Sequence, residues 1–421
     1  MALPPALRHS GFRGYLAGSF VSNAGNSLQA AALSLHVYQL TGSSLMVGLM
    51  GLVRVVPLVA LTLFGGVLAD HADRRKVMLL TQSGMALVAL LAFALTYTGS
   101  VTVGGLYLVV ALNAIARAFD GPARQAMFFR LVPRKDFANA ASLNAVTWQA
   151  CDVVGPVLAG FLIAGGGLGR LGGYSLCYGL NFASFAAVMM AVWWLPPCLP
   201  ESTSEAPKSF GEVFQRIGDG LQFVNRTPVV RQAMWVDFWA TLWSGANALI
   251  PAMSTSILGL DARGYGLLRA SSAIGAGVAA LALSALPTIR RQGRVVVIMI
   301  GFYGLFTIAF GFSNSLWTAS LSLALVGASD MISTVMRQTI RQLTTPDELR
   351  GRMNATSSLF HISGPQLGDA EAGAAAALWG ERVSIVLGGG LCLFVAAHWS
   401  QAKALVQYRH GDHEAQEGYV A

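Results

Sequence analysis

The charged stretch Gly66-Val-Leu-Ala-Asp70-His-Ala-Asp73-Arg74-Arg75-Lys76 decides how the chain is interpreted, because apolar runs at residues 46–69 and 77–98 meet there. Each run has the roughly 20 mostly apolar residues that a helix needs to cross a bilayer. Only 11% of the 421 residues are charged, so such a dense group of charges stands out. We interpret the stretch as the turn between two membrane helices.

The composition supports a membrane protein. The chain is 54% hydrophobic with a mean hydropathy of +0.56, whereas about 25% of the residues of a soluble domain are charged. The 28 Lys and Arg residues exceed the 20 Asp and Glu residues, but they fall in short loops rather than on one soluble face, so no nucleic-acid partner is expected. The four cysteines have neither CxxC nor Cys/His spacing, and therefore neither a disulfide framework nor a metal site is predicted.

Apolar runs long enough to cross a bilayer occur along the whole chain. The first lacks the flanking pattern of a cleaved signal peptide, so we expect it to be retained. The sequence predicts an all-α membrane protein with twelve transmembrane helices in two six-helix bundles. The predicted spans are 14–38, 46–69, 77–98, 104–130, 142–164, 174–195, 229–256, 264–287, 295–312, 316–342, 352–379 and 383–404.

Basic residues predict the orientation. Most Lys and Arg residues fall in the loops on the side of the N-terminus, whereas the opposite loops hold only Arg170, Arg263, Arg269 and Arg382. Cytoplasmic loops carry such an excess of basic residues. We therefore expect a multi-pass protein with both termini in the cytoplasm.

The longest polar segment divides the chain in two. Apolar residues at positions 210, 213, 214, 217, 221 and 224 follow a helical period, which predicts an amphipathic helix on the cytoplasmic surface. The predicted organisation is an N-terminal bundle at 1–195, a linker at 196–228, a C-terminal bundle at 229–405 and a cytoplasmic tail at 406–421.

An internal repeat agrees with this division. Arg124-Gln125 precedes Pro133 with the same spacing as Arg337-Gln338 precedes Pro346, and a GxxxxG motif follows each proline, at 155–160 and at 368–373. The two copies are 213 positions apart, about half the chain, as a duplicated six-span unit predicts. Chance similarity is the alternative, because small residues are frequent in all membrane helices.

The opening stretch and the twelve spans resemble the major facilitator superfamily, whose loop after the second span runs Gly-x-x-x-Asp-Arg-x-Gly-Arg-Lys. Gly66, Asp70, Arg74 and Arg75 match this pattern, whereas a histidine and Asp73 depart from it. The resemblance implies a gating loop that stabilises one state of an alternating-access cycle. A plain loop obeying the positive-inside rule explains the arginines but not Asp70.

A second motif of the same superfamily matches in the fifth span. Gly155-Pro156-Val-Leu-Ala-Gly160 resembles its proline-containing antiporter motif, which is associated with export. Physically, the proline frees a backbone carbonyl and the glycines allow close helix approach, so the segment can bend and slide. Helix packing without any coupling role is the alternative.

Four further segments resemble a bacterial branch called transmembrane secretion effectors, which includes siderophore exporters and macrolide efflux proteins. They are residues 54–57, 117–125, 345–352 and 366–373. The resemblance implies export across the bacterial cytoplasmic (inner) membrane. Asp152 is a departure, because many relatives are expected to carry a basic residue there.

Ionisable side chains inside the predicted spans are costly, so they are expected to face a cavity or to pair with each other. A proton carrier must exchange its proton as its surroundings change, which suits a carboxylate near a guanidinium. The candidates for proton coupling are Asp120, Asp152, Asp330 and Glu371. The candidates for the substrate cavity are Asn23, Asn26, Arg54, Arg117, Arg124, Asp237 and Asp369. Structural ion pairs and helix packing are the alternatives for each, and packing is the expected role of His36 and His361.

The function that these features predict is secondary active transport. No GxxxxGK[ST] motif and no catalytic set occur, so we expect neither an enzyme nor a cofactor, and energy from an ion gradient. Embedded arginines suit an anionic substrate. We expect a monomeric, proton-coupled antiporter that exports a small polar molecule, with a siderophore as the favoured substrate. A multidrug or macrolide efflux pump and a non-transporting membrane scaffold are the alternatives.

The two halves differ at the gating turn, which yields a prediction. The corresponding turn of the second half carries Arg290, Arg291 and Arg294 but no acid, so Asp70 has no counterpart there. Asp70→Asn is expected to slow transport far more than Arg290→Gln, as measured by initial rates in proteoliposomes. Equal loss in the two variants would contradict a one-sided gating role.

Overall fold

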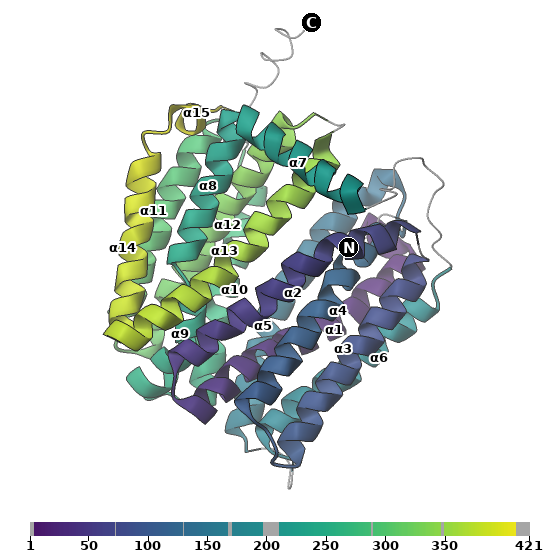
Figure 1. The fold of residues 1–421 in the computed structure, drawn as a ribbon, viewed down its shortest axis with the longest axis vertical. Coiled ribbons are helices and arrows are strands. Elements are labelled where there is room, and N and C mark those ends of the chain that lie inside the picture. Colours follow the sequence, from purple (N-terminus) through teal and green to yellow (C-terminus); the bar gives the residue numbers. More distant parts are fainter. Residues whose placement is uncertain are drawn as a thin grey trace, which may run out of the picture. The chain divides into compact units, whose positions relative to one another are not determined.

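The computed structural model describes residues 4–71, 73–128, 130–166, 171–196, 210–287, 289–346 and 349–409 (Figure 1). These residues form helices joined by turns, and they divide into two compact units. The N-terminal unit comprises Met1–Gly42, Leu52–Pro207 and Ser254–Ala270. The C-terminal unit comprises Ser43–Gly51, Lys208–Met253 and Ser271–Ala421.

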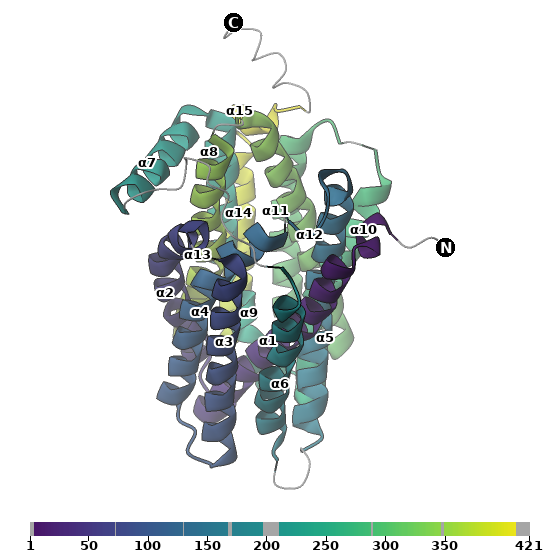
Figure 2. The same ribbon diagram turned by 90° about the vertical axis from the view of Figure 1, so that its right-hand side faces the viewer.

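The N-terminal unit is a helical bundle around buried aromatic and methionine side chains. Its α-helices are α1 (Ser10–Thr41), α2 (Ser44–His71) from residue 52 onward, α3 (Arg74–Tyr97), α4 (Val103–Phe128), α5 (Phe137–Ala164) and α6 (Gly173–Trp193). Helix α1 packs on α5 and α6, and α3 lies beside α4 and α6 in both views (Figures 1 and 2). The side chains of Phe12, Tyr15, Met85 and Phe185 fill the core and are almost fully buried.

The C-terminal unit is built in a related way. Its α-helices are α7 (Phe210–Arg226), α8 (Pro228–Trp243), α9 (Ala246–Ala252), α10 (Ala262–Ala285) from residue 271 onward, α11 (Gln292–Gly311), α12 (Leu316–Thr344), α13 (Arg350–Trp379), α14 (Glu381–Trp399) and α15 (Lys403–Val406). Helix α11 packs on α12 and α14, and α8 packs on α13. The first residues of α2, up to Gly51, also belong to the C-terminal unit. In the same way, the first residues of α10, up to Ala270, belong to the N-terminal unit.

Each of the twelve predicted spans overlaps one or more helices among the described residues. Within the described residues, 9 helices are long and apolar enough to cross a membrane. The helices at the other predicted spans, α1, α8 with α9, and α13, do not meet this criterion, and α8 and α9 have only 16 and 7 residues, so the count of twelve crossings stays a prediction. The amphipathic segment of the predicted linker forms α7, whereas residues 197–209 of that linker lie outside the described part.

The seventh predicted span is not a continuous helix. Helix α8 ends at Trp243 and α9 begins at Ala246, followed by a π-helical turn at Met253–Ile257. A carboxylate oxygen of Asp369, on α13, accepts a hydrogen bond from the backbone N–H of Ala248 at 3.2 Å. Asp369 therefore satisfies one of the free amides at the start of α9.

The two GxxxxG motifs place helices in close contact at equivalent positions. A Cβ atom on Gly155 would lie 2.6 Å from the backbone of α1 at Leu28, and one on Gly368 would lie 2.5 Å from the Thr241 carbonyl of α8. The second glycines pack on the first residues of α10 and α2: a Cβ on Gly160 would lie 2.5 Å from the Ala262 carbonyl, and one on Gly373 would lie 2.8 Å from the Ser44 carbonyl. The sequence repeat is therefore also a repeat of packing.

The gating loop is described only in part. Asp73 caps α3 by accepting a hydrogen bond from the Arg75 backbone at 3.1 Å. The Arg75 guanidinium donates to the carbonyl of Trp193, the last residue of α6, and its carbon lies 5.4 Å from the centre of the Trp193 ring. Gly66 and Asp70 lie within α2, but the Asp70 side chain is outside the described residues, so its gating role stays a prediction.

The close approach at Gly155 makes a testable prediction. Gly155→Leu is expected to lower the melting temperature of the purified protein, because overpacking a tight helix contact costs about 1–3 kcal/mol. The matched control is Gly84→Leu on α3, where a Cβ meets nothing within 4 Å, and it is expected to melt like the parent protein. Identical melting temperatures for the two variants would show that the contact does not constrain the fold.

Candidate functional site

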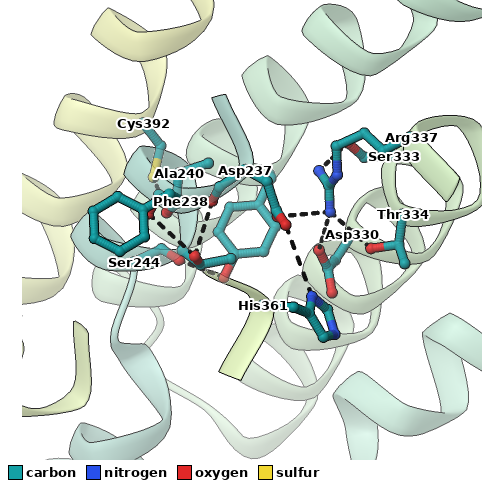
Figure 3. Close-up of polar contacts among 12 residues, drawn as sticks. Asp237, Phe238, Ala240, Ser244, Asp330, Ser333, Thr334, Arg337, His361 and Cys392 are labelled. Carbon is teal, nitrogen blue, oxygen red and sulfur yellow. Dashed lines mark hydrogen bonds and ion pairs between the residues drawn. The ribbon is translucent and has the colours of Figure 1, made fainter. Parts of the chain in front are cut away.

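A buried arginine organises the polar interior of the C-terminal unit. The side chain of Arg337, on α12, is only 8% exposed, and its Nη2 lies 2.7 Å from Oδ1 of Asp237 on α8 (Figure 3). The guanidinium also donates to the hydroxyl oxygens of Ser333 at 2.6 Å and of Thr334 at 2.9 Å. A buried guanidinium needs such partners, because an unpaired charge in an apolar interior is strongly unfavourable.

A second acid and a histidine complete the cluster. Oδ1 of Asp330 lies 4.0 Å from the same Nη2 of Arg337, and its side chain is 49% exposed. Nδ1 of His361, on α13, lies 3.7 Å from Oδ2 of Asp237 and its side chain is 60% exposed. One permanent cation therefore faces two carboxylates, and one of these also faces a titratable ring (Figure 3).

Helical spacing explains why these groups converge. Asp330, Ser333 and Arg337 are spaced i, i+3, i+7, which places them on one face of α12. Beside them is a small cavity of about 10 Å³, close to what one water molecule needs. The cavity is lined by Asp237, Ala240, Thr241, Met299, Ile300, Tyr303, Ser329, Asp330, Ser333 and Arg337. The arrangement can hold an ion pair of Arg337, allow Arg337 to exchange one carboxylate for the other, and place a water molecule beside these groups.

The N-terminal unit holds a simpler pair at the equivalent arginine. Nε of Arg124 lies 2.9 Å from Oδ2 of Asp120, four residues earlier on α4. The other oxygen of Asp120 lies 3.0 Å from the Thr81 hydroxyl and 2.7 Å from the Gln82 amide nitrogen. The arginine also donates to Ser19 at 3.3 Å. Both charges are buried and satisfied, which suits a structural pair.

The remaining sequence candidates lie elsewhere in their units. Asp152 is exposed on α5 and its Oδ1 accepts from the Ser27 hydroxyl at 3.1 Å, whereas Arg117 is exposed on α4. Asn23 and Asn26 are buried in α1, Arg54 and Glu371 are half-buried, and Asp369 caps α9. Of the predicted residues, the structure therefore brings Asp237 together with Asp330, and Asp120 together with Arg124.

Sequence reasoning missed Arg337 and His361 as site residues. Arg337 matches Arg124 at the repeat spacing of 213 positions, and that match is the signal that identifies it as an embedded arginine. No comparable signal exists for His361, because its contact with Asp237 joins residues 124 positions apart and depends on how α13 packs on α8. Among the described residues, no group of three or more His, Cys, Asp or Glu side chains is arranged to hold a metal ion.

The buried pair predicts non-additive stability changes. Asp237→Asn or Arg337→Gln alone leaves one buried charge without its main partner, which is expected to cost about 3–5 kcal/mol of unfolding free energy. The double variant is expected to recover part of that loss, whereas Thr334→Val, which removes one hydrogen bond, should cost about 1 kcal/mol. Thermal unfolding of the four purified variants checks this, and additive losses would show that the two side chains do not depend on each other.

Comparisons with known proteins agree with this architecture. The family model described as transmembrane secretion effector matches residues 2–419. Two similar curated proteins are named enterobactin exporter EntS. The one from Salmonella choleraesuis is 27% identical over 378 residues, which are 88% of this chain and 86% of the relative. The one from Escherichia coli O81 is 25% identical over 380 residues, with the same coverage of 88% and 86%.

Solved structures of transporters share the fold. A bacterial homologue of the human lysosomal transporter Spinster, in an inward-facing and unoccupied conformation, superposes with a TM-score of 0.73 at 13% identity over 97% of this chain and 100% of that one. The nucleoside transporter NupG gives a TM-score of 0.70 at 14% identity over 93% of this chain and 98% of that one. These likenesses establish the major facilitator fold. The chain is a multi-pass inner-membrane transporter that belongs to the transmembrane secretion effector family.

Proposed function

We propose that this chain is a proton-coupled antiporter that exports a siderophore from the cytoplasm by alternating access, with both termini cytoplasmic. The relatives named enterobactin exporter support the substrate class, because they match 88% of this chain and 86% of their own length. The distribution of basic loop residues supports the orientation. No GxxxxGK[ST] motif occurs in the sequence, which favours an ion gradient as the source of energy.

The observation that carries the coupling proposal is the cluster of Asp237, Asp330, Arg337 and His361. A nearby guanidinium favours the deprotonated, charged form of a carboxylate. When the guanidinium moves to another partner, that carboxylate takes up a proton more readily. Arg337 has two such partners, at 2.7 Å and 4.0 Å. Asp330 holds the looser contact and is half exposed, so it is our first candidate for the proton carrier.

The other acids differ in how available they are. Asp120 has its two oxygens occupied by Arg124, Thr81 and Gln82, which makes it a poorer carrier. Asp152 is exposed with one hydroxyl donor, and Glu371 is half-buried on α13, so both remain secondary candidates. Export of an anion and entry of a proton both move net positive charge into the cell, so a membrane potential that is negative inside favours both steps of such an exchange.

Deletion of the gene tests the substrate class. Cells lacking it are expected to secrete several-fold less iron chelator under iron starvation and to recover when the parent gene is restored. A gene that carries Asp330→Asn is expected not to restore secretion. The matched control is Asp261→Asn, because that acid is 61% exposed in a loop, and it should restore secretion.

Unchanged chelator secretion with increased antibiotic sensitivity would instead identify a multidrug pump. Unchanged secretion together with no proton movement in proteoliposomes would favour a scaffold. Full recovery of secretion with the Asp330→Asn variant would show that another acid carries the proton.

A further inference from the structure

The hydroxyl groups around the small cavity beside Arg337 differ in how they are used. Thr241 on α8 and Ser329 on α12 each donate to a backbone carbonyl of their own helix at 2.8 Å. The Tyr303 hydroxyl, on α11, instead accepts a hydrogen bond from the Ser244 hydroxyl at 2.5 Å. A tyrosine hydroxyl has one hydrogen to donate, so accepting from Ser244 leaves that hydrogen for another acceptor.

Acceptors for this hydrogen lie on the cavity wall. The carboxylates of Asp237 and Asp330 line the same cavity as Tyr303, and Asp330 acts on Tyr303 electrostatically. Oδ1 of Asp237 is buried and lies 2.7 Å from Nη2 of Arg337, but it accepts no hydrogen bond of good geometry from the described residues. The cavity of about 10 Å³ is close to what one water molecule needs. One water molecule there can accept from Tyr303 and donate to both carboxylates.

Ser244 connects this cavity to the break in the seventh predicted span. It directly follows α8, is 5% exposed, and precedes Gly245, after which α9 begins. The backbone of the break is held tightly by neighbouring helices. A Cβ on Gly245 would lie 2.0 Å from the Gly368 carbonyl oxygen of α13, and one on Gly388 of α14 would lie 2.2 Å from the Trp243 carbonyl oxygen. The Ser244 hydroxyl links this packed break to α11 through Tyr303.

Charged and titratable groups from several helices act on the two carboxylates of the cavity. They are Arg337 and Arg341 on α12, His361 on α13 and the Tyr303 hydroxyl on α11. Tyr303 itself also faces Cys392 on α14 and Asp369 on α13 electrostatically. Helix α10 has no titratable side chain from residue 271 to residue 285. Since arginine and tyrosine keep one charge state near neutral pH, the acids and His361 are the groups whose charge can change.

We propose that the cavity binds one water molecule that links Tyr303 to Asp330 and Asp237, and that Tyr303 is a positioning residue that transmits the charge of Asp330 to the break between α8 and α9. The proposal rests on the proposed function, because it gives the coupling acid a connection to a part of the fold that can move. Asp330 holds the proton, and Tyr303 acts through the water and through Ser244.

The direction of the hydrogen bonds explains how the charge is transmitted. When both acids are charged, the bonds run from Ser244 to Tyr303, from Tyr303 to the water and from the water to the carboxylates, and each bond strengthens the next. Protonation makes Asp330 a donor and removes one of the two charged acceptors, so the bond between Tyr303 and Ser244 weakens. The break is then held less firmly to α11.

Amide hydrogen exchange at residues 244–252 of the purified full-length protein in nanodiscs tests the proposal. With the intrinsic effect of pH on exchange subtracted, the parent protein is expected to lose protection several-fold as the pH is lowered over the range in which it stays folded. In Asp330→Asn, Tyr303→Phe and Ser244→Ala, protection should be low at every pH. Because Tyr303→Phe and Ser244→Ala remove the same link, the double variant should match either single variant.

Two further variants serve as controls. Tyr408→Phe removes the hydroxyl of a buried tyrosine in another hydrophobic cluster of the same unit, and it should behave like the parent. His361→Gln removes the other group that titrates, and it should keep the pH dependence. Thermal unfolding shows whether each variant is folded, and Ser244→Ala provides the test if Tyr303→Phe is not.

The outcomes separate this proposal from the proposed function. Protection that is independent of pH in the parent, or that depends on pH equally in the parent and in Tyr303→Phe, overturns the role of Tyr303 and leaves proton-coupled export standing. Loss of the pH dependence in His361→Gln but not in Asp330→Asn assigns it to the histidine and also overturns the proposal. A pH dependence lost in Tyr303→Phe, together with export from proteoliposomes without proton movement, supports the link and contradicts the proposed coupling.

Discussion

The buried ion pair between Arg337 and Asp237 is the interaction on which the polar interior of the C-terminal unit depends. A guanidinium that is 8% exposed is tolerated because a carboxylate and two hydroxyl groups surround it. Those partners come from α8 and α12, and His361 on α13 contacts the other oxygen of Asp237, so the ion pair and its neighbours connect three helices. Any movement that separates Asp237 from Arg337 must supply each with a new partner, and Asp330 and His361 stand within 4 Å of the pair.

The two units share packing features at the repeated positions but differ in how the arginine there is paired. Both retain an arginine at the repeated position and glycines where helices cross, which are requirements of packing. The partners of the arginine differ between the two units. Arg124 is neutralised within its own helix, whereas Arg337 reaches a neighbouring helix and has a second acid nearby. An arginine paired within one helix need not respond when helices move, so the C-terminal unit is the better candidate for coupling.

Hydropathy predicted where the long helices lie, because a bilayer span requires a long apolar run whatever its neighbours are, but it did not predict the division of the seventh span into α8 and α9. Helical spacing places Asp120 and Arg124 on one face of α4, but the sequence alone does not say that these two side chains pair with each other. The break at Ser244 and Gly245, the capping of α9 by Asp369 and the contact of His361 with Asp237 depend on how α13 packs on α8. Contacts between distant segments leave no local pattern in a single sequence.

The central claim is that proton movement is coupled to export through the ion-pair cluster of the C-terminal unit. Proteoliposomes loaded with a pH-sensitive dye and exposed to an enterobactin gradient measure this directly. We predict substrate-dependent proton movement opposite to the direction of substrate transport, and its loss in Asp330→Asn, with substrate binding retained. Enterobactin transport that proceeds at the full rate without any change of internal pH would contradict the account.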